Sequence, residues 1–422
     1  MLRLRSSTPL RPQHRLGSFA PPVATLAAVA ALALSACSAG PEASGDVEEL
    51  EGASIQMRLD QAYQALESGD LGRAEAIALP IAEDGSPSAQ FLAGRVFEDL
   101  SERAELPEGD REAYAASARA WYERAALQEF AAAQVNLALM LLSGRGGPSE
   151  PGAAHDWLKR AAQRADGSGE ARAQFLLGEW YRSGRYAPAD AGESLYWYRL
   201  AGQQGEPRAQ WMAGRLILAG KGTASDPRAA AAWFESAAAQ RFAPAQAELA
   251  RLYLEGNGVL ASESEALRLL NDAADQGDLQ ALNQLGQLHA QGRAVDRDPQ
   301  VALRYFERAA AEGFAPAQAN AGLMRLRGDG VQKDEAAAVR WFAMAAEQGD
   351  RTAMVRLANL MVAGRGTEID LVGAAGWYQV AAALGHDDGE NRLIDLQQKL
   401  SEEQIQAAAD WADAWIRRAT AR

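Results

Sequence analysis

Residues 317–349 read AQANAGLMRLRGDGVQKDEAAAVRWFAMAAEQG, and this stretch is one unit of a repeat that decides the fold. Aromatic or large apolar residues recur at a spacing of 36 residues, except for one step of 40. The series is Trp121, Trp157, Trp197, Trp233, Leu269, Tyr305, Trp341 and Trp377. Because each period holds two helical patterns, the repeat predicts a stack of helical hairpins whose extended surface serves binding rather than catalysis.

A second series, of glycines, stands 13 residues before every mark after Trp121, at Gly144, Gly184, Gly220, Gly256, Gly292, Gly328 and Gly364. The four-residue insertion therefore lies between Trp157 and Gly184. A glycine just past a helix end adopts positive φ and allows the last carbonyls to be satisfied. Several of these glycines belong to a Gly-x-Gly pair, such as Gly328 with Gly330. The pairs lack the preceding strand and the following Gly-Lys-Ser/Thr of a phosphate loop, so we interpret them as turns.

The helices of each hairpin are marked by an apolar stripe and by cap residues. In the first helix, Leu177 and Trp180 illustrate an i, i+3 stripe that predicts a buried face, and Gly178 between them lets the partner helix approach closely. The second helix begins after a residue of N-cap type in most units, namely Glu150, Asp190, Asp226, Ser262, Asp298, Asp334 and Asp370.

This pattern resembles the Sel1-like repeat family. The matching residues of the quoted unit are Ala317, Gly322, Gly328-Asp329-Gly330-Val331, Asp334, Trp341-Phe342, Ala345-Ala346 and Gly349. The resemblance covers about 300 of the 422 residues and implies an all-α, right-handed helical-repeat solenoid of about eight hairpins over residues 87–386. Because the family consists mostly of adaptors and scaffolds, the resemblance also implies protein partners and no enzymatic activity.

Two shorter segments flank the solenoid. Residues 54–86 resemble a tetratricopeptide (TPR) unit and are expected to form a helical hairpin around Gly69-Asp70. Residues 387–422 are expected to form C-terminal capping helices, because the capping-box sequence 401–404 precedes an apolar helical face. The alternative is a helix that docks a partner, with Trp411 as its anchor.

The N-terminus has the pattern of a secretion signal. Residues 1–36 contain arginines but no acidic residue, and the apolar run 23–34 is too short to span a bilayer. The run ends in Leu34-Ser35-Ala36-Cys37, which resembles the lipobox of bacterial lipoproteins. The resemblance implies removal of 1–36, lipidation of Cys37 and, from Ser38, sorting to the outer membrane. Residues 37–53, small and acidic, are expected to be a lipidated disordered tether.

Composition excludes several classes of function. The net charge of −14 becomes more negative once the signal arginines are removed, which disfavours nucleic acid and favours partners with basic residues. The four histidines, His14, His155, His289 and His386, lie in separate segments, so we expect neither a metal site nor another cofactor. No nucleophile motif is present, and we assign no catalytic residue.

Partner specificity is expected where the repeats differ from one another. Two positions of the first helix vary freely, and as i, i+4 neighbours they share one helical face, which lines the concave surface in related folds. The candidate partner-binding pairs are Phe91 with Arg95, Phe175 with Glu179, Trp211 with Arg215, and Asn283 with Gln287. Trp211 beside Arg215 suits a protein anchor or sugar stacking, whereas the structural alternative is that Trp211 wedges between repeats.

Together these features predict a lipid-anchored scaffold that faces the periplasm from the outer membrane. The chain is also loosely similar in architecture to lipoproteins of alginate-type exopolysaccharide export, which link an outer-membrane porin to periplasmic enzymes. The alternative is direct carbohydrate or peptidoglycan binding, which requires an aromatic row on the open face. Trp211, Phe91 and Phe175 are the candidates for that row.

Overall fold

The computed structural model describes residues 43–163 and 169–420, with side chains described from residue 54 onward. The expected signal segment 1–36 and Cys37, the expected lipidation site, lie outside the described residues. The chain divides into two units, residues 1–57 and 58–422. All regular secondary structure in the described residues is helical, which confirms the predicted all-α class.

The first helix begins earlier than the sequence analysis expected. α1 spans Ala43–Glu67, so part of the segment expected to be a disordered tether is helical. Residues 48–51, Glu-Glu-Leu-Glu, are all good helix formers, and this local preference explains the extension. Within the second unit, the C-terminal part of α1 packs against α2 (Leu71–Glu83) through Leu59, Ala62 and Leu66.

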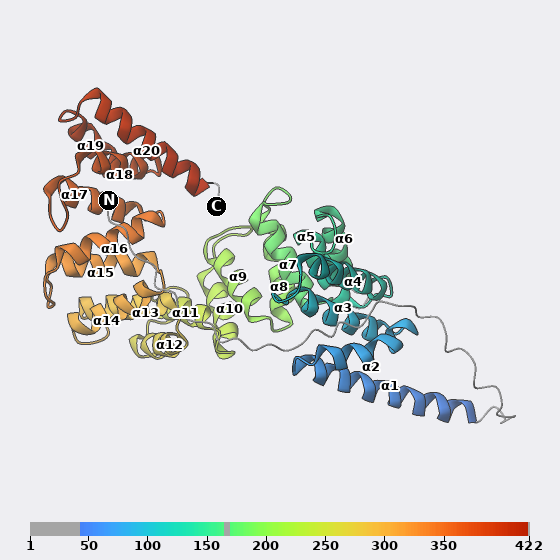
Figure 1. Ribbon diagram of the computed structural model, residues 1–422. Helices are drawn as coiled ribbons and strands as arrows, with labels where there is room; N and C mark the ends of the chain where they lie inside the picture. The colour runs from blue at the N-terminus through green and yellow to red at the C-terminus, as the bar shows by residue number, and fades with distance from the viewer. Residues whose placement is uncertain (1–42, 164–168, 421–422) are drawn as a thin grey trace, which may run out of the picture. The chain divides into compact units, whose positions relative to one another are not determined.

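The predicted solenoid is present as eight consecutive helical hairpins, whose paired helices lie side by side in Figure 1. The pairs are α3 (Pro87–Ser101) with α4 (Glu108–Leu127), α5 (Ala131–Ser143) with α6 (Pro151–Ala162), α7 (Ala171–Ser183) with α8 (Ala191–Gln203), α9 (Pro207–Leu218) with α10 (Pro227–Ala239), α11 (Ala243–Glu255) with α12 (Glu263–Asp275), α13 (Leu279–Gln291) with α14 (Pro299–Ala311), α15 (Ala315–Arg327) with α16 (Glu335–Glu347), and α17 (Arg351–Ala363) with α18 (Leu371–Ala383). From α6 to α18, each second helix begins directly after its predicted N-cap residue.

The core of each hairpin is built around the residue that follows the aromatic mark. Tyr198 is fully buried, and its ring covers Gly178, where an added Cβ would lie 2.6 Å from the ring atoms. Several marks, such as Trp233, are only partly buried. Trp233 reaches back to the preceding hairpin, where its ring lies over Gly202. The marks therefore contribute largely to packing between hairpins.

In most hairpins a buried glutamine ties the first helix to the hairpin before it, whereas α13 and α17 carry Leu282 and Met354 at the equivalent position. The Nε2 atom of Gln210 donates to the Gly202 carbonyl at 2.9 Å, and its Oε1 accepts from Gln240 at 3.0 Å. The same paired glutamines recur at Gln90 with Gln128, Gln174 with Gln204, Gln246 with Gln276, and Gln318 with Gln348. Sequence analysis did not identify this structural role.

Caps and turns close the helix ends as the repeat predicts. The Asp226 carboxylate accepts from the Ala229 amide at 3.0 Å, and five of the other predicted caps make equivalent bonds. Glu150 is the exception, because its carboxylate instead pairs with Arg119 at 2.6 Å. Gly258 has φ +79°, and a Cβ there would lie 2.3 Å from the Pro227 carbonyl oxygen, so the turn needs glycine.

The C-terminal end is covered by α19 (Asp387–Gln397) and α20 (Glu402–Thr420). α20 packs on α18, with the Trp411 ring 4.8 Å from that of Trp377 and the Trp415 ring 6.0 Å from it. Ser401 and Gln404 form the reciprocal bonds of a capping box. Trp411, the alternative docking anchor, is thus already engaged in this packing.

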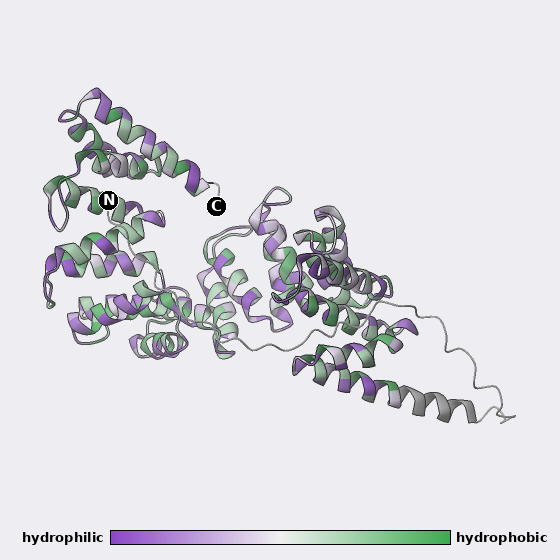
Figure 2. Ribbon diagram, viewed as in Figure 1, coloured by the Kyte–Doolittle hydropathy of each residue, from purple (hydrophilic) through white to green (hydrophobic). Residues whose placement is uncertain are grey.

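Most helices alternate between apolar and polar residues along their length, as Figure 2 shows. Apolar residues bury one face of each helix against its neighbours, so the hydrophobic core runs from hairpin to hairpin. Among the helices of the described residues, none combines the length and apolarity required to cross a bilayer.

Candidate partner-binding cleft

Two of the four predicted pairs come together at a single cavity of about 420 Å³. Phe175 and Glu179 reach it from α7, and Trp211 and Arg215 from α9. We call this cavity the α7–α9 cleft, and its further lining residues are Arg182, Arg208, Met212 and Phe242. Its volume falls within the range of small-ligand and side-chain pockets.

The repeat itself explains why these four residues meet. Phe175 and Trp211 occupy the same position in successive repeats, as do Glu179 and Arg215. Within each helix the pair is four residues apart and therefore on one face. Equivalent faces of adjacent helices in a solenoid point in the same direction, so the two pairs form one surface.

A second cavity, of about 380 Å³, adjoins the cleft and shares Arg182, Met212 and Arg215 with it. This neighbouring cavity extends towards the N-terminus of α8 and the turn after α9, where Ser194 and Lys221 line it. The two cavities together provide room for a short segment of another chain.

Trp211 forms part of the apolar wall of the cleft. Its ring meets that of Phe242 edge-on at 5.9 Å, and the Arg215 guanidinium lies 4.8 Å from the ring centroid. Phe242 is the N-cap of α11, so Trp211 does bridge adjacent hairpins as the structural alternative proposed. The buried indole Nε1 has no hydrogen-bond partner among the described residues.

Glu179 is the carboxylate of the cleft and is held by two donors. The Tyr198 hydroxyl donates to one carboxylate oxygen, and Arg182 donates to the other at 2.6 Å. Burial acts to raise the pKa of Glu179, but the hydrogen bonds from Arg182 and Tyr198 outweigh it and hold the pKa below its usual value. Glu179 is therefore ionised at neutral pH, and its charge is neutralised by Arg182.

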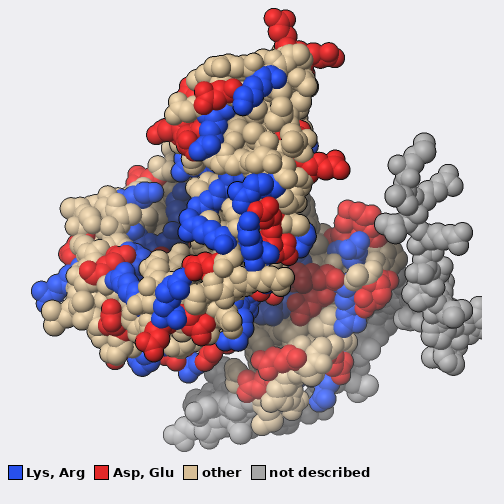
Figure 3. Space-filling view, turned by 90° about the vertical axis from the view of Figure 1, so that its left-hand side faces the viewer, with Lys and Arg blue, Asp and Glu red and all other residues tan. Residues whose placement is uncertain are grey.

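The remaining charges of the two cavities are positive. Arg208, Arg215 and Lys221 are exposed, and none makes an ion pair with another described residue. On the face that Figure 3 presents, basic and acidic side chains are interspersed, and several Lys and Arg side chains lie together near its middle. The charge of a local surface therefore differs from the net charge of the chain, which alone suggested basic partners.

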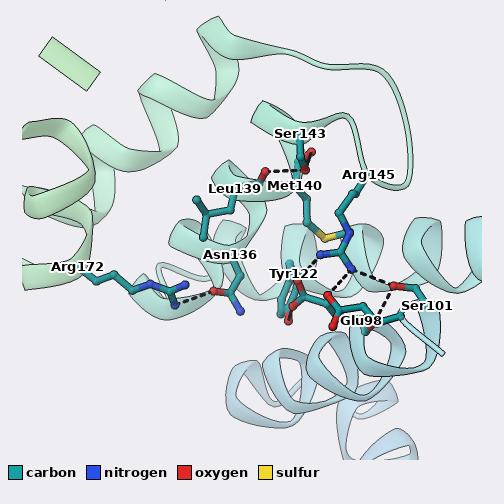
Figure 4. Close-up of polar contacts among 10 residues, drawn as sticks. Glu98, Ser101, Tyr122, Asn136, Leu139, Met140, Ser143, Arg145 and Arg172 are labelled. Carbon is teal, nitrogen blue, oxygen red and sulfur yellow. Dashed lines mark hydrogen bonds and ion pairs between the residues drawn. The ribbon is translucent and has the colours of Figure 1, made fainter. Parts of the chain in front are cut away.

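The pair Phe91 and Arg95 lies on α3, away from the cleft residues. The Phe91 ring lies 5.8 Å from that of Tyr122 and 5.2 Å from that of Phe130, so it is partly buried and packs against a core cluster. Beside it, Tyr122 donates to Glu98 at 2.6 Å, and Arg145 bonds Glu98 at 3.2 Å, as Figure 4 shows. These contacts tie α3, α4 and the turn after α5 together.

The pair Asn283 and Gln287 lies on α13 and lines none of the cavities described above. Asn283 is buried and accepts from Asn320 of the next hairpin at 2.9 Å, whereas Gln287 is exposed. Asn283 thus has a structural bond of its own.

The residues of the two cavities that sequence reasoning missed include Arg182, Arg208, Met212, Lys221 and Phe242. Arg208 precedes Trp211 by three residues and Arg182 follows Glu179 by three, so i, i+3 neighbours of the predicted pairs carried a signal. Phe242 precedes its helix, and no helical offset identifies it.

Within the described part of the chain, no cluster of three or more His, Cys, Asp or Glu residues could hold a metal ion. The cleft instead combines aromatic surface with guanidinium groups. Such surfaces are suited to equilibrium binding of a polar chain.

A family model for the Sel1 repeat matches eight segments of the chain: 111–130, 131–166, 171–206, 207–242, 243–278, 279–314, 315–350 and 352–386. The chain belongs to the Sel1 repeat family. Sel1 repeats are protein-interaction scaffolds, and they generally mediate contacts between proteins.

Solved structures give the same fold. A Sel1 repeat protein from Oxalobacter formigenes is 29% identical, with a TM-score of 0.59, over 79% of this chain and 93% of that one. The protective antigen c5321 of uropathogenic Escherichia coli, described as displaying an SLR fold, is 24% identical, with a TM-score of 0.51, over 88% and 93%. No curated protein matches the chain.

Proposed function

We propose that this Sel1 repeat protein is a non-enzymatic, lipid-anchored scaffold that binds a protein partner at the periplasmic face of the outer membrane. The observation that carries the binding role is the α7–α9 cleft, where two variable pairs from successive repeats line one cavity. Tryptophan and arginine are the residue types that most often anchor protein interfaces.

Affinity capture from cells of the source organism tests the role of the cleft. The variant Trp211→Ala with Arg215→Glu removes the aromatic wall and reverses one charge. The matched control, Tyr196→Ala with Arg199→Glu, makes the same changes on exposed residues of α8 that line neither cavity. We expect a defined partner to be retained by the control and lost from the cleft variant. Equal retention by both variants would refute the assignment.

The anchor rests on the lipobox-like sequence before Cys37. Two or three acyl chains give stable membrane attachment, whereas one chain binds only marginally. Replacing Cys37 with alanine should therefore move the protein into the soluble fraction and abolish labelling by a fatty-acid probe. The control Ala39→Ser should remain in the membrane fraction. A membrane-bound Cys37→Ala variant would contradict the proposed anchor.

The pathway that we propose is exopolysaccharide export of the alginate type. Its support is the order of segments, a lipobox-like sequence, a TPR-like hairpin and Sel1 repeats. Deletion of the gene should then reduce exported polymer, and crosslinking should link the protein to an outer-membrane porin. Unchanged export would remove this pathway while leaving the scaffold role intact.

Direct carbohydrate or peptidoglycan binding has less support from the geometry. That function requires a row of open aromatic rings, but Phe91 packs against Tyr122 and Phe130. Of the three candidates, only Phe175 and Trp211 line the cleft.

A further inference from the structure

The positive charge of the α7–α9 cleft contrasts with the acidic chain that carries it. The chain has a net charge of −14, and many of its arginines are neutralised by neighbours. Arg251 contacts Glu248 and Glu255, and Arg268 contacts Glu265 and Asp272. Arg208, Arg215 and Lys221 have no such carboxylate among the described residues, so an anionic group from outside could bind them without displacing an internal partner.

The geometry of Arg215 favours binding of a planar anion. Its guanidinium rests over the Trp211 ring, which restricts the side chain while leaving its edge donors free. A guanidinium presents donors in a fixed fork that matches a carboxylate in two parallel bonds. Arg208 lines the same cavity from the first turn of α9.

The apolar part of the cleft points to a ligand that is not purely ionic. Phe175, Trp211, Met212 and Phe242 form a wall beside the arginines. Phe242 and Trp211 are already packed edge-on, so their positions are fixed before binding. An aliphatic or aromatic side chain against this wall would bury apolar surface, which favours binding.

We propose that the α7–α9 cleft binds an acidic segment of a protein partner. Carboxylates of the segment contact Arg208 and Arg215 in the cleft and Lys221 in the adjoining cavity, and one apolar side chain packs on Trp211 and Phe242. This inference rests on the proposed scaffold function and names the chemistry of the partner. It replaces the expectation of a basic partner, because the local charges rather than the net charge face the ligand.

A protein segment suits the cleft better than a long polyanion does. A polyuronate or nucleic acid would extend beyond the cleft over a chain of net negative charge, which repels it. The aromatic wall also offers nothing to a polymer of uniform charge. A short acidic segment that carries an apolar residue can contact both the basic side chains and the apolar wall.

The test uses the full-length protein in detergent, immobilised on beads. Its probes are a pool of labelled decapeptides built from Glu, Asp, Leu, Phe and Gly, and a matched pool with Gln and Asn in place of the acids. We expect wild type to retain the acidic pool at least about tenfold more strongly than the neutral pool. Arg208→Gln with Arg215→Gln should lose that tenfold excess, because the variant removes both guanidinium groups that the carboxylates contact in the cleft.

The matched control is Arg199→Gln with Arg228→Gln. Both residues are exposed and line none of the cavities described above. Their replacement changes the net charge of the chain by the same amount as the cleft variant does. We expect this control to retain the acidic pool as wild type does, with circular dichroism showing that both variants are folded. Equal loss in the two variants would show unspecific attraction and overturn the proposal.

Two further outcomes separate this inference from the scaffold function. In the first, wild type retains the acidic and the neutral peptides equally, and Trp211→Ala retains neither. That result would support protein binding at the cleft but refute the preference for acidic segments. Retention of an oligouronate that depends on Arg208 and Arg215, without retention of the acidic peptides, would overturn both the acidic-peptide assignment and the protein-binding role of the cleft.

Discussion

Gly214 lies beneath the ring of Phe234, so that a Cβ added to the glycine would lie 2.6 Å from the nearest ring atom. The same relationship holds for Gly178 with Tyr198 and for Gly286 with Phe306, twenty residues apart in each case. Where alanine replaces the glycine, at Ala138 and Ala250, the residue twenty positions later is leucine. Ala358 departs from this rule, because it is followed by Tyr378.

This relationship predicts a compensating pair of substitutions. Gly214→Ala should destabilise the protein by about 1 to 3 kcal/mol, because the methyl group overpacks the ring of Phe234. Adding Phe234→Leu should recover much of that loss, since the repeats with alanine use leucine at the equivalent position. Urea denaturation of the two single variants and the double variant measures the coupling. Purely additive effects would show that the two residues do not constrain each other.

The buried glutamines predict a second effect on stability. Gln210→Leu should cost about 1 to 3 kcal/mol, because it removes two hydrogen bonds, one to the Gly202 carbonyl and one from the Gln240 amide. The exposed Gln203 provides the control, and Gln203→Leu should change the free energy of unfolding by less than about 0.5 kcal/mol. Thermal unfolding followed by circular dichroism compares the two variants. If both had equal stability, the glutamine would contribute no net stabilisation.

The caps of the second helices give a third prediction. Asp226→Ala removes the acceptor for the Ala229 amide and should destabilise the protein by about 0.5 to 2 kcal/mol. Asp226→Asn keeps a side-chain oxygen at the same place and should retain most of the stability. Denaturation midpoints in urea distinguish the two variants. A loss of equal size in both would mean that charge, and not the cap bond, accounts for the effect.

The hydrogen bonds to Glu179 predict a dependence of stability on pH. The folded pKa of Glu179 lies below its usual value, so ionisation of the group stabilises the fold above the unfolded pKa, and this contribution is lost as pH falls through the folded pKa. Glu179→Gln should therefore be less stable than wild type at pH 7, and the difference should shrink below about pH 4.5. Unfolding midpoints measured from pH 3 to 8 check this. A difference that is independent of pH would exclude a role for the charge.

Much of the fold could be predicted from the sequence because the same helix and turn signals recur in most of the repeat units. The caps from Asp190 onward and the turn glycines recur at one spacing, so each helix boundary supports the others. The start of α1 at Ala43 could not be inferred in this way, because that helix lies outside the repeat.

The candidate site was only partly predictable for a different reason. Offsets within a helix identify residues on one face, and they brought Phe175, Glu179, Trp211 and Arg215 to one cavity. Offsets do not show which side chains already have an internal partner, such as Asn283, which is bonded to Asn320. They also omit a residue such as Phe242, which enters the cleft from the end of a loop.

The most direct test of the central claim is site-specific photocrosslinking in living cells. A benzoylphenylalanine replaces Phe242 in the cleft or, as the control, Tyr196 on the exposed face of α8. A cleft that binds a protein partner predicts a crosslink to one defined periplasmic or outer-membrane protein from position 242 and none to that protein from position 196. No protein crosslink from position 242, or the same products from both positions, would contradict the claim.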